Sequence, residues 1–144
     1  MVALGPTSVG KSPAGDARVK IGEDGRWGGS LEFYYRGVDR DVLILRADGG
    51  IDATNAHEFL SELSRLIEGG IRKMIVDCSG LEHISSSGVA TLVRLHRRLW
   101  AVGGQVKLAA LTGPVFRLLE VTKLAELFEI YPSVDAARNA FREG

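Results

Sequence analysis

One stretch constrains the fold of this chain more than any other. An apolar segment at 74–76 is followed directly by Asp77, and three serines and a glycine follow at 85–88. The segment is short and rich in β-branched residues, which is typical of a buried parallel strand. We expect a loop over residues 78–84 and then a helix with an apolar stripe at helical spacing, made of Val89, Leu92, Val93, His96, Leu99 and Trp100. Functional groups usually gather at the carboxyl ends of strands in open α/β sheets, so the sequence places hydroxyl side chains where a site is expected.

The rest of the chain repeats this alternation of strand and helix. Strands are predicted at 31–35, 42–45, 106–109 and 127–131, and further helices after Asp52, Thr112 and Pro132. Asp52 is predicted to cap the first helix. The order β-β-α-β-α-β-α-β-α predicts an α/β fold with a single mixed, mostly parallel sheet of about five strands and about four flanking helices.

Composition bounds the domain organisation and the partners. Residues 1–29 are rich in glycine, proline and serine and are predicted to be a flexible arm, followed by one domain over 30–144. Lysine plus arginine and aspartate plus glutamate are 18 each, which gives no electrostatic case for binding nucleic acid or a membrane surface. The single cysteine, Cys78, excludes an internal disulfide. With no membrane-length apolar run and no signal peptide pattern, we expect a cytoplasmic protein.

The most conspicuous motif match lies in the N-terminal arm. Residues 5–12, G-P-T-S-V-G-K-S, fit the Walker A pattern, and the strand ending at Asp77 could pass for Walker B. A phosphate loop needs a buried strand before it and an amphipathic helix after it, because these aim the amide donors. Only four residues precede Gly5, and a glycine-broken stretch follows Ser12. A P-loop NTPase is therefore the least favoured alternative, and no enzymatic activity is predicted.

Other catalytic and metal-binding patterns are weak. The histidines His57, His83 and His96 are not spaced as metal ligands, and no G-x-S-x-G elbow is present, so we expect neither a metal nor a cofactor. The serines at 85–87 have two interpretations. One of them is explained as an ordinary helix N-cap, whereas a phosphoryl group on another would be tolerated by the helix dipole and would add about −1.5 to −2 charges to the surface.

These residues resemble a known family. The pattern M-I-V-D-C-S-G-L-E-H-I-S-S-S-G-V-A-T-L is similar to the STAS domain of bacterial anti-sigma factor antagonists, and V-F-R-L-L-E-V-T-K-L-A-E-L-F-E-I-Y-P-S-V-D-A-A resembles a later part of the same domain. The resemblance implies a non-catalytic protein that binds an anti-sigma factor, which is also a serine kinase of the GHKL type, and so frees a sigma factor. It implies that phosphorylation ends the binding and that a PP2C-type phosphatase restores it. By motif position the acceptor is Ser86, with Ser85 and Ser87 as alternatives, since Ser85 stands where the family usually has aspartate.

The resemblance also implies where the partner binds. The expected face consists of the loop after Asp77, the first turn of the following helix and the neighbouring turn around Asp52. Gly88 is expected to allow close approach of the partner's backbone. The residues assigned to this face are Asp52, Ser79, Glu82, His83, Ser85, Ser87, Gly88 and Thr91. We expect a monomer or a weak dimer. The alternative is a STAS scaffold that is not phosphorylated, or a subunit of a larger assembly of the stressosome or lipid-transport kind.

Overall fold

A computed structural model describes residues 17–21, 31–39 and 41–143 of the chain. They form one sheet in the order β1-β2-β3-β4-β5-β6, antiparallel from β1 to β3 and parallel from β3 to β6. The strands are β1 (Ala17–Ile21), β2 (Leu31–Asp39), β3 (Val42–Ile51), β4 (Lys73–Ile84), β5 (Gln105–Ala109) and β6 (Glu129–Tyr131). The predicted α/β class with a mixed, mostly parallel sheet is confirmed.

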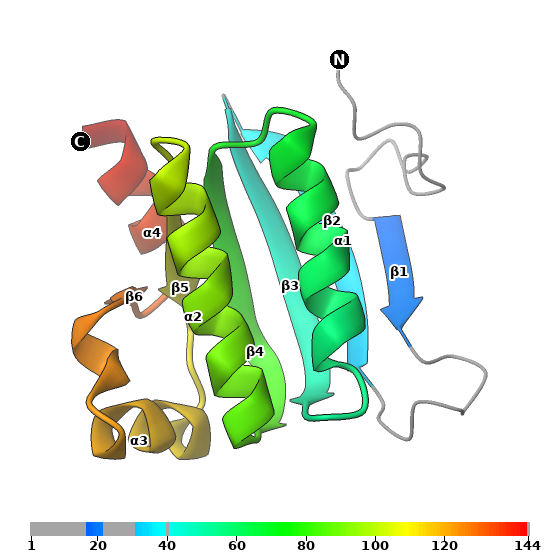
Figure 1. Ribbon diagram of the computed structural model, residues 1–144. Helices are drawn as coiled ribbons and strands as arrows, with labels where there is room; N and C mark the ends of the chain where they lie inside the picture. Colours follow the sequence, from blue (N-terminus) through cyan, green and yellow to red (C-terminus); the bar gives the residue numbers. More distant parts are fainter. Residues whose placement is uncertain (1–16, 22–30, 40, 144) are drawn as a thin grey trace.

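Four α-helices and one short 3-10 helix surround this sheet. They are α1 (Ala56–Glu68), α2 (Ser86–Ala101), α3 (Gly113–Val121), η1 (Leu124–Glu126) and α4 (Val134–Glu143). Helices α1 and α2 lie side by side on the front face, α4 lies behind the sheet, and α3 lies at its lower end (Figure 1). The parallel strands β3 and β4 run downward in this view, so their carboxyl ends and the start of α2 meet at the lower end.

The sheet has one strand more than the sequence analysis predicts. Strand β1 pairs with β2 from Ala17↔Tyr35 to Ile21↔Leu31, within the segment predicted to be a flexible arm. Its sequence, A-R-V-K-I, alternates apolar and charged residues, which is a weak strand signal that the surrounding glycines hide. The remainder of that predicted arm, including the Walker A match at 5–12, lies outside the described residues.

The main hydrophobic core lies between the sheet and the two front helices. Helix α1 buries Ala56, Phe59, Leu60, Leu63, Leu66 and Ile67. Helix α2 differs from the expected stripe, because Leu95 is fully buried whereas Trp100 is 66% exposed. The buried face of α2 is therefore rotated about the helix axis relative to the predicted stripe, and it includes Leu95 and Leu99, which face α1 and the sheet. A smaller core on the back face consists of Val42, Ile44, Ile75, Ala109, Ala137 and Phe141.

Candidate functional site

The candidate site lies where β3 and β4 end and α2 begins. Residues 78–84, predicted to be a loop, instead continue β4, and β3 continues beside them to Ile51. The pairing persists through Gly49↔Leu81 and Ile51↔Ile84, with register shifts between Arg46 and Asp48 and between Gly49 and Gly50. The Ser85 amide then donates to the Ile51 carbonyl at 2.9 Å. The start of α2 is consequently held on an extended strand pair.

The three serines occupy three different positions at the start of α2. Ser85 is the N-cap, with extended backbone (φ −90°, ψ 177°), and its hydroxyl oxygen accepts a hydrogen bond from the Gly88 amide at 3.3 Å. Ser86 is the first residue of the helix and is exposed. Ser87 is half-buried, and its carbonyl accepts from the Thr91 hydroxyl at 3.0 Å. Capping thus explains Ser85, and Ser86 presents its side chain at the helix N-terminus, where amides and dipole favour negative charge.

Two residues assigned to the partner face turn inward. Thr91 is only 2% exposed, so it supports the first turn of α2 from within. Gly88 is buried, and a Cβ atom there would lie 2.5 Å from Ile84 Cγ1 and 2.6 Å from the Ile51 carbonyl oxygen. The expectation that Gly88 leaves room for a partner's backbone is therefore wrong. It leaves room for β3, which lets α2 start close against the sheet.

The turn between β3 and α1 forms the second edge of the site. Asp52 is not the cap of α1, because the helix begins at Ala56 and Asn55 occupies the cap position. The Asp52 carboxylate instead accepts from the Thr54 amide at 2.9 Å and from the Thr54 hydroxyl. These hydrogen bonds, the hydroxyl first, hold the pKa of Asp52 below its ordinary value, and the nearby charge of His83 acts in the same direction.

Asn55, which is not among the residues assigned to the partner face, organises this turn. Its side chain is buried, donates from Nδ2 to the Gly50 carbonyl at 3.0 Å and accepts from the Asp52 amide at 3.1 Å. Asparagine at the end of a D-x-x-N stretch, one turn after a glycine pair, is the signal that could have identified it.

The remaining predicted residues lie on the surface of the extended part of β4. Ser79, Glu82 and His83 are all exposed. The His83 ring lies against Gly50, where a Cβ atom would come within 2.1 Å of the ring. The site thus brings Asp52, His83 and the start of α2 to one end of the sheet, with Ser79 farther back along β4.

This arrangement offers exposed hydroxyl, carboxylate and imidazole groups on a rigid frame. The described residues contain no group of three or more histidine, cysteine or acidic side chains placed to hold a metal ion. Within the same residues, no helix combines the length and apolar character that crossing a bilayer requires. Cys78 is fully buried beneath the site, and burial raises the pKa of its thiol to about 12.

Comparison with known proteins identifies the family. Residues 36–137 match the STAS domain. The chain belongs to the STAS domain family. This STAS domain is 28% identical over 101 residues to a Bordetella bronchiseptica protein described as an anti-sigma factor antagonist, BtrV, a match that covers 70% of this chain and 87% of the relative.

Solved structures show the same domain. A Thermotoga maritima protein described as an anti-sigma factor antagonist superposes with a TM-score of 0.69 at 26% identity, over 73% of this chain and 91% of that one. The anti-sigma factor antagonist SpoIIAA in its unphosphorylated form gives a TM-score of 0.67 over 78% of this chain and 97% of its own. At 20% identity, the latter likeness shows the fold alone.

Proposed function

We propose that this STAS domain is an anti-sigma factor antagonist that is switched by phosphorylation of Ser86. In the unphosphorylated state it binds an anti-sigma factor, itself a serine kinase of the GHKL type, and thereby frees a sigma factor. A PP2C-type phosphatase reverses the modification. The observation that carries the proposal is the exposed hydroxyl of Ser86 at the first position of α2, beside a serine that is already used as the cap. The Bordetella bronchiseptica relative that is described as an anti-sigma factor antagonist supports the antagonist role.

The helix start can accept the modification without unfolding. The free amides and the dipole at the start of α2 favour a phosphate, which carries about −1.5 to −2 charges at neutral pH. The Ser85 cap and the bond from the Ser85 amide to Ile51 involve no atom of the Ser86 side chain. The modification therefore changes the charge of the surface and leaves the backbone in place.

That charge is sufficient to end a complex. A phosphate buried against a partner without a matching cation loses its hydration, which costs several kcal/mol. Each 1.4 kcal/mol is about a tenfold loss of affinity, so a micromolar complex would become undetectable. Asp52, whose carboxylate is ionised at neutral pH, adds a second negative charge at this end of the sheet.

The position of the acceptor can be tested with matched serine variants. Incubation with a cognate kinase and ATP should give one phosphoserine peptide that covers residues 85–87. Ser86→Ala should abolish the label, whereas Ser87→Ala, which changes a half-buried neighbour, should retain it. Equal labelling of Ser86→Ala would show that the acceptor is misassigned. Ser86→Asp should also weaken the complex with the anti-sigma factor, and an unchanged dissociation constant would count against the switch.

A scaffold that is not phosphorylated is the second candidate. Ser85 favours it, because the aspartate expected before the acceptor is missing and a neutral cap replaces it. A stable particle of high mass in size-exclusion chromatography, unaffected by Ser86→Asp, would support this alternative.

A further inference from the structure

A concave region lies at the opposite end of the sheet from Ser86. Lys73 begins β4 and Gln105 begins β5, and a groove of about 360 Å³ opens between these amino ends, β6 and α4. This volume falls at the lower end of the range typical of small-molecule sites. None of the residues assigned to the partner face lines the groove.

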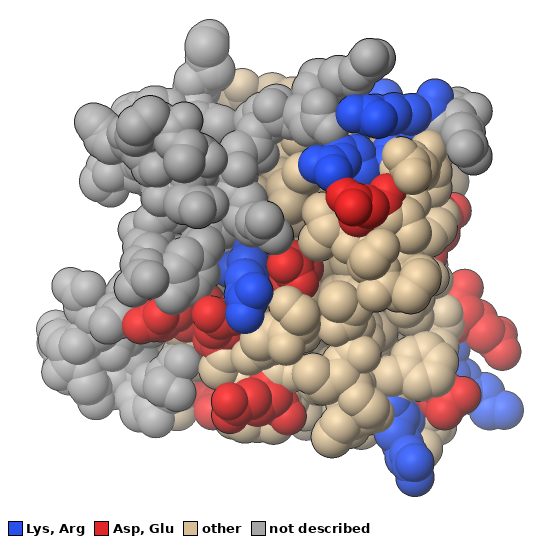
Figure 2. Space-filling view, turned by 180° about the vertical axis from the view of Figure 1, so that it is seen from behind, with Lys and Arg blue, Asp and Glu red and all other residues tan. Residues whose placement is uncertain are grey.

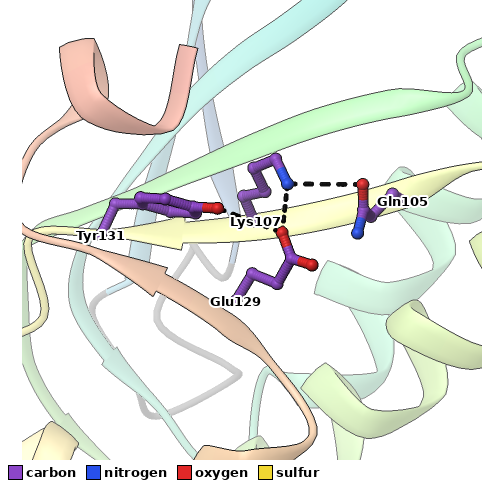
Figure 3. Close-up of polar contacts among 4 residues, drawn as sticks. All are labelled: Gln105, Lys107, Glu129 and Tyr131. Carbon is purple, nitrogen blue, oxygen red and sulfur yellow. Dashed lines mark hydrogen bonds and ion pairs between the residues drawn. The ribbon is translucent and has the colours of Figure 1, made fainter. Parts of the chain in front are cut away.

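The interior of the groove contains a buried lysine. Lys107 follows Val106 on β5, and the alternation of the strand turns its side chain away from the main core and toward α4. Lys107 is 3% exposed, and an ammonium group at such a depth requires compensation. Glu129 forms an ion pair with it, and Gln105 Oε1 lies 3.4 Å from Nζ (Figure 3).

Two aromatic rings complete the wall. The Lys107 ammonium lies 4.4 Å from the centre of the Phe141 ring and 5.4 Å from that of Tyr131. The Tyr131 hydroxyl donates to the same Glu129 oxygen that Lys107 contacts, at 3.2 Å (Figure 3). The polar groups of the interior are thus fixed by one another, and the rings offer an apolar surface beside them.

The rim of the groove has an excess of positive charge. The lining carries Arg72, Lys73 and Lys107 against Glu129 alone, and Glu129 is already paired with Lys107. The Arg72 guanidinium donates from Nη1 to two uncharged carbonyls, and Lys73 meets an exposed Asp41 carboxylate at 3.4 Å, a solvent-screened pair. Seen from behind, lysine and arginine side chains gather at the upper end of the described surface, the end at which β4 and β5 begin (Figure 2).

We infer that this groove binds a small organic anion whose phosphate or carboxylate group is held by Lys73, with Arg72 adding positive charge at the same edge of the sheet, and whose planar part lies against Tyr131 and Phe141. Gly103 widens the entrance, because even an added Cβ atom there would meet no atom within 4 Å, whereas Gly104 lets the chain pass close to the Arg72 carbonyl. The fixed Lys107–Glu129 pair provides a polar wall without competing for the anionic group. The inference is independent of the proposed phosphorylation of Ser86.

A set of three probes tests the inference on the full chain. Phenyl phosphate combines an anion and a ring, inorganic phosphate provides the anion alone, and benzylamine provides the ring with a positive charge. In a ¹H–¹⁵N NMR titration, phenyl phosphate should shift the amide signals of Gly103, Gly104 and Gln105 in a saturable way. Inorganic phosphate should bind more weakly, and benzylamine should leave these signals unchanged. Binding of benzylamine alone, or no saturable shift with phenyl phosphate, would overturn the inference.

Charge-removing variants locate the anionic group. Arg72→Gln combined with Lys73→Gln should weaken phenyl phosphate binding at least tenfold, while Arg97→Gln, an exposed position on α2 outside the groove, should leave it unchanged. Because Arg72 also donates to the end of α1, Lys73→Gln alone is the second variant if the double variant does not fold. Unchanged affinity in a folded variant that lacks the rim charge would show that the rim does not hold the anion.

Discussion

Replacing Gly88 with alanine tests how closely α2 must start against the sheet. The added Cβ atom would lie 2.5 Å from Ile84 Cγ1, 2.6 Å from the Ile51 carbonyl oxygen and 3.0 Å from Ile51 Cβ. The backbone oxygen cannot rotate away, so the start of the helix must move. Overpacking of this kind costs about 1 to 3 kcal/mol, and the better helix propensity of alanine returns about 0.5 to 1 kcal/mol. Because the two shortest contacts are far inside the normal approach of a Cβ atom, the upper part of that cost applies, and we expect Gly88→Ala to lower the free energy of unfolding by about 1 to 2 kcal/mol.

Urea unfolding provides the assay and Gly113→Ala the control. Gly113 is the first residue of α3, and an added Cβ there meets no atom within 4 Å. The same substitution at that position should leave stability unchanged or raise it by up to about 1 kcal/mol. Gly88→Ala should lower the urea midpoint by roughly 0.5 to 1 M. If both variants unfold at the wild-type midpoint, the close approach of α2 to β3 does not govern stability and the reasoning is refuted.

Three further predictions follow from the described contacts. Asn55→Ala should cost about 1 to 3 kcal/mol in urea unfolding, because it leaves the Gly50 carbonyl and the Asp52 amide without their buried partner; wild-type stability would contradict this. Cys78, fully buried with its thiol pKa raised to about 12, should react with Ellman's reagent at pH 8 only as fast as the chain unfolds. Glu129→Gln should destabilise at pH 7 and lose its effect in acid, because the bond from Lys107 lowers the Glu129 pKa in the folded state. That contribution to stability is present above pH 4.5, the ordinary pKa of this carboxyl, and disappears as the pH falls through the lowered pKa of the folded state. A stability difference between Glu129→Gln and the wild type that stays constant across this pH range would contradict the prediction.

The sequence predicts the helices and the parallel strands well because their apolar periodicity is local. It underestimates β3 and β4 because their extensions carry polar residues and glycines, which locally indicate a loop. The pairing of Gly49 with Leu81 and of Ile51 with Ile84 depends on residues about 30 positions apart. One of these glycines, Gly80, is required by the pairing itself, because a Cβ atom there would lie 1.8 Å from the Asp48 carboxylate on the neighbouring strand.

Prediction of the helix cap succeeds at α2 and fails at the turn before α1. A serine next to an amphipathic run is a reliable cap, and Ser85 fills that role. Asp52 and Asn55 both suit a helix start, and only the tertiary contact of Asn55 with Gly50 decides between them. The inward orientation of Gly88 and Thr91 follows from the rotation of α2 about its axis, which the exposure of Trp100 shows to differ from the expected stripe.

The continuation of β4 to Ile84 limits how Ser86 can meet another molecule. Ser86 follows directly on β4, and the hydrogen bond from the Ser85 amide to β3 fixes the backbone before it. Ser86 therefore cannot move away from the domain as a residue in a mobile loop does. An enzyme that acts on Ser86 would have to bind the end of a folded helix, because Ser86 does not lie in an extended peptide. A short synthetic peptide spanning residues 80–92 would lack that shape and should be a poor substrate, so recognition would demand the intact domain.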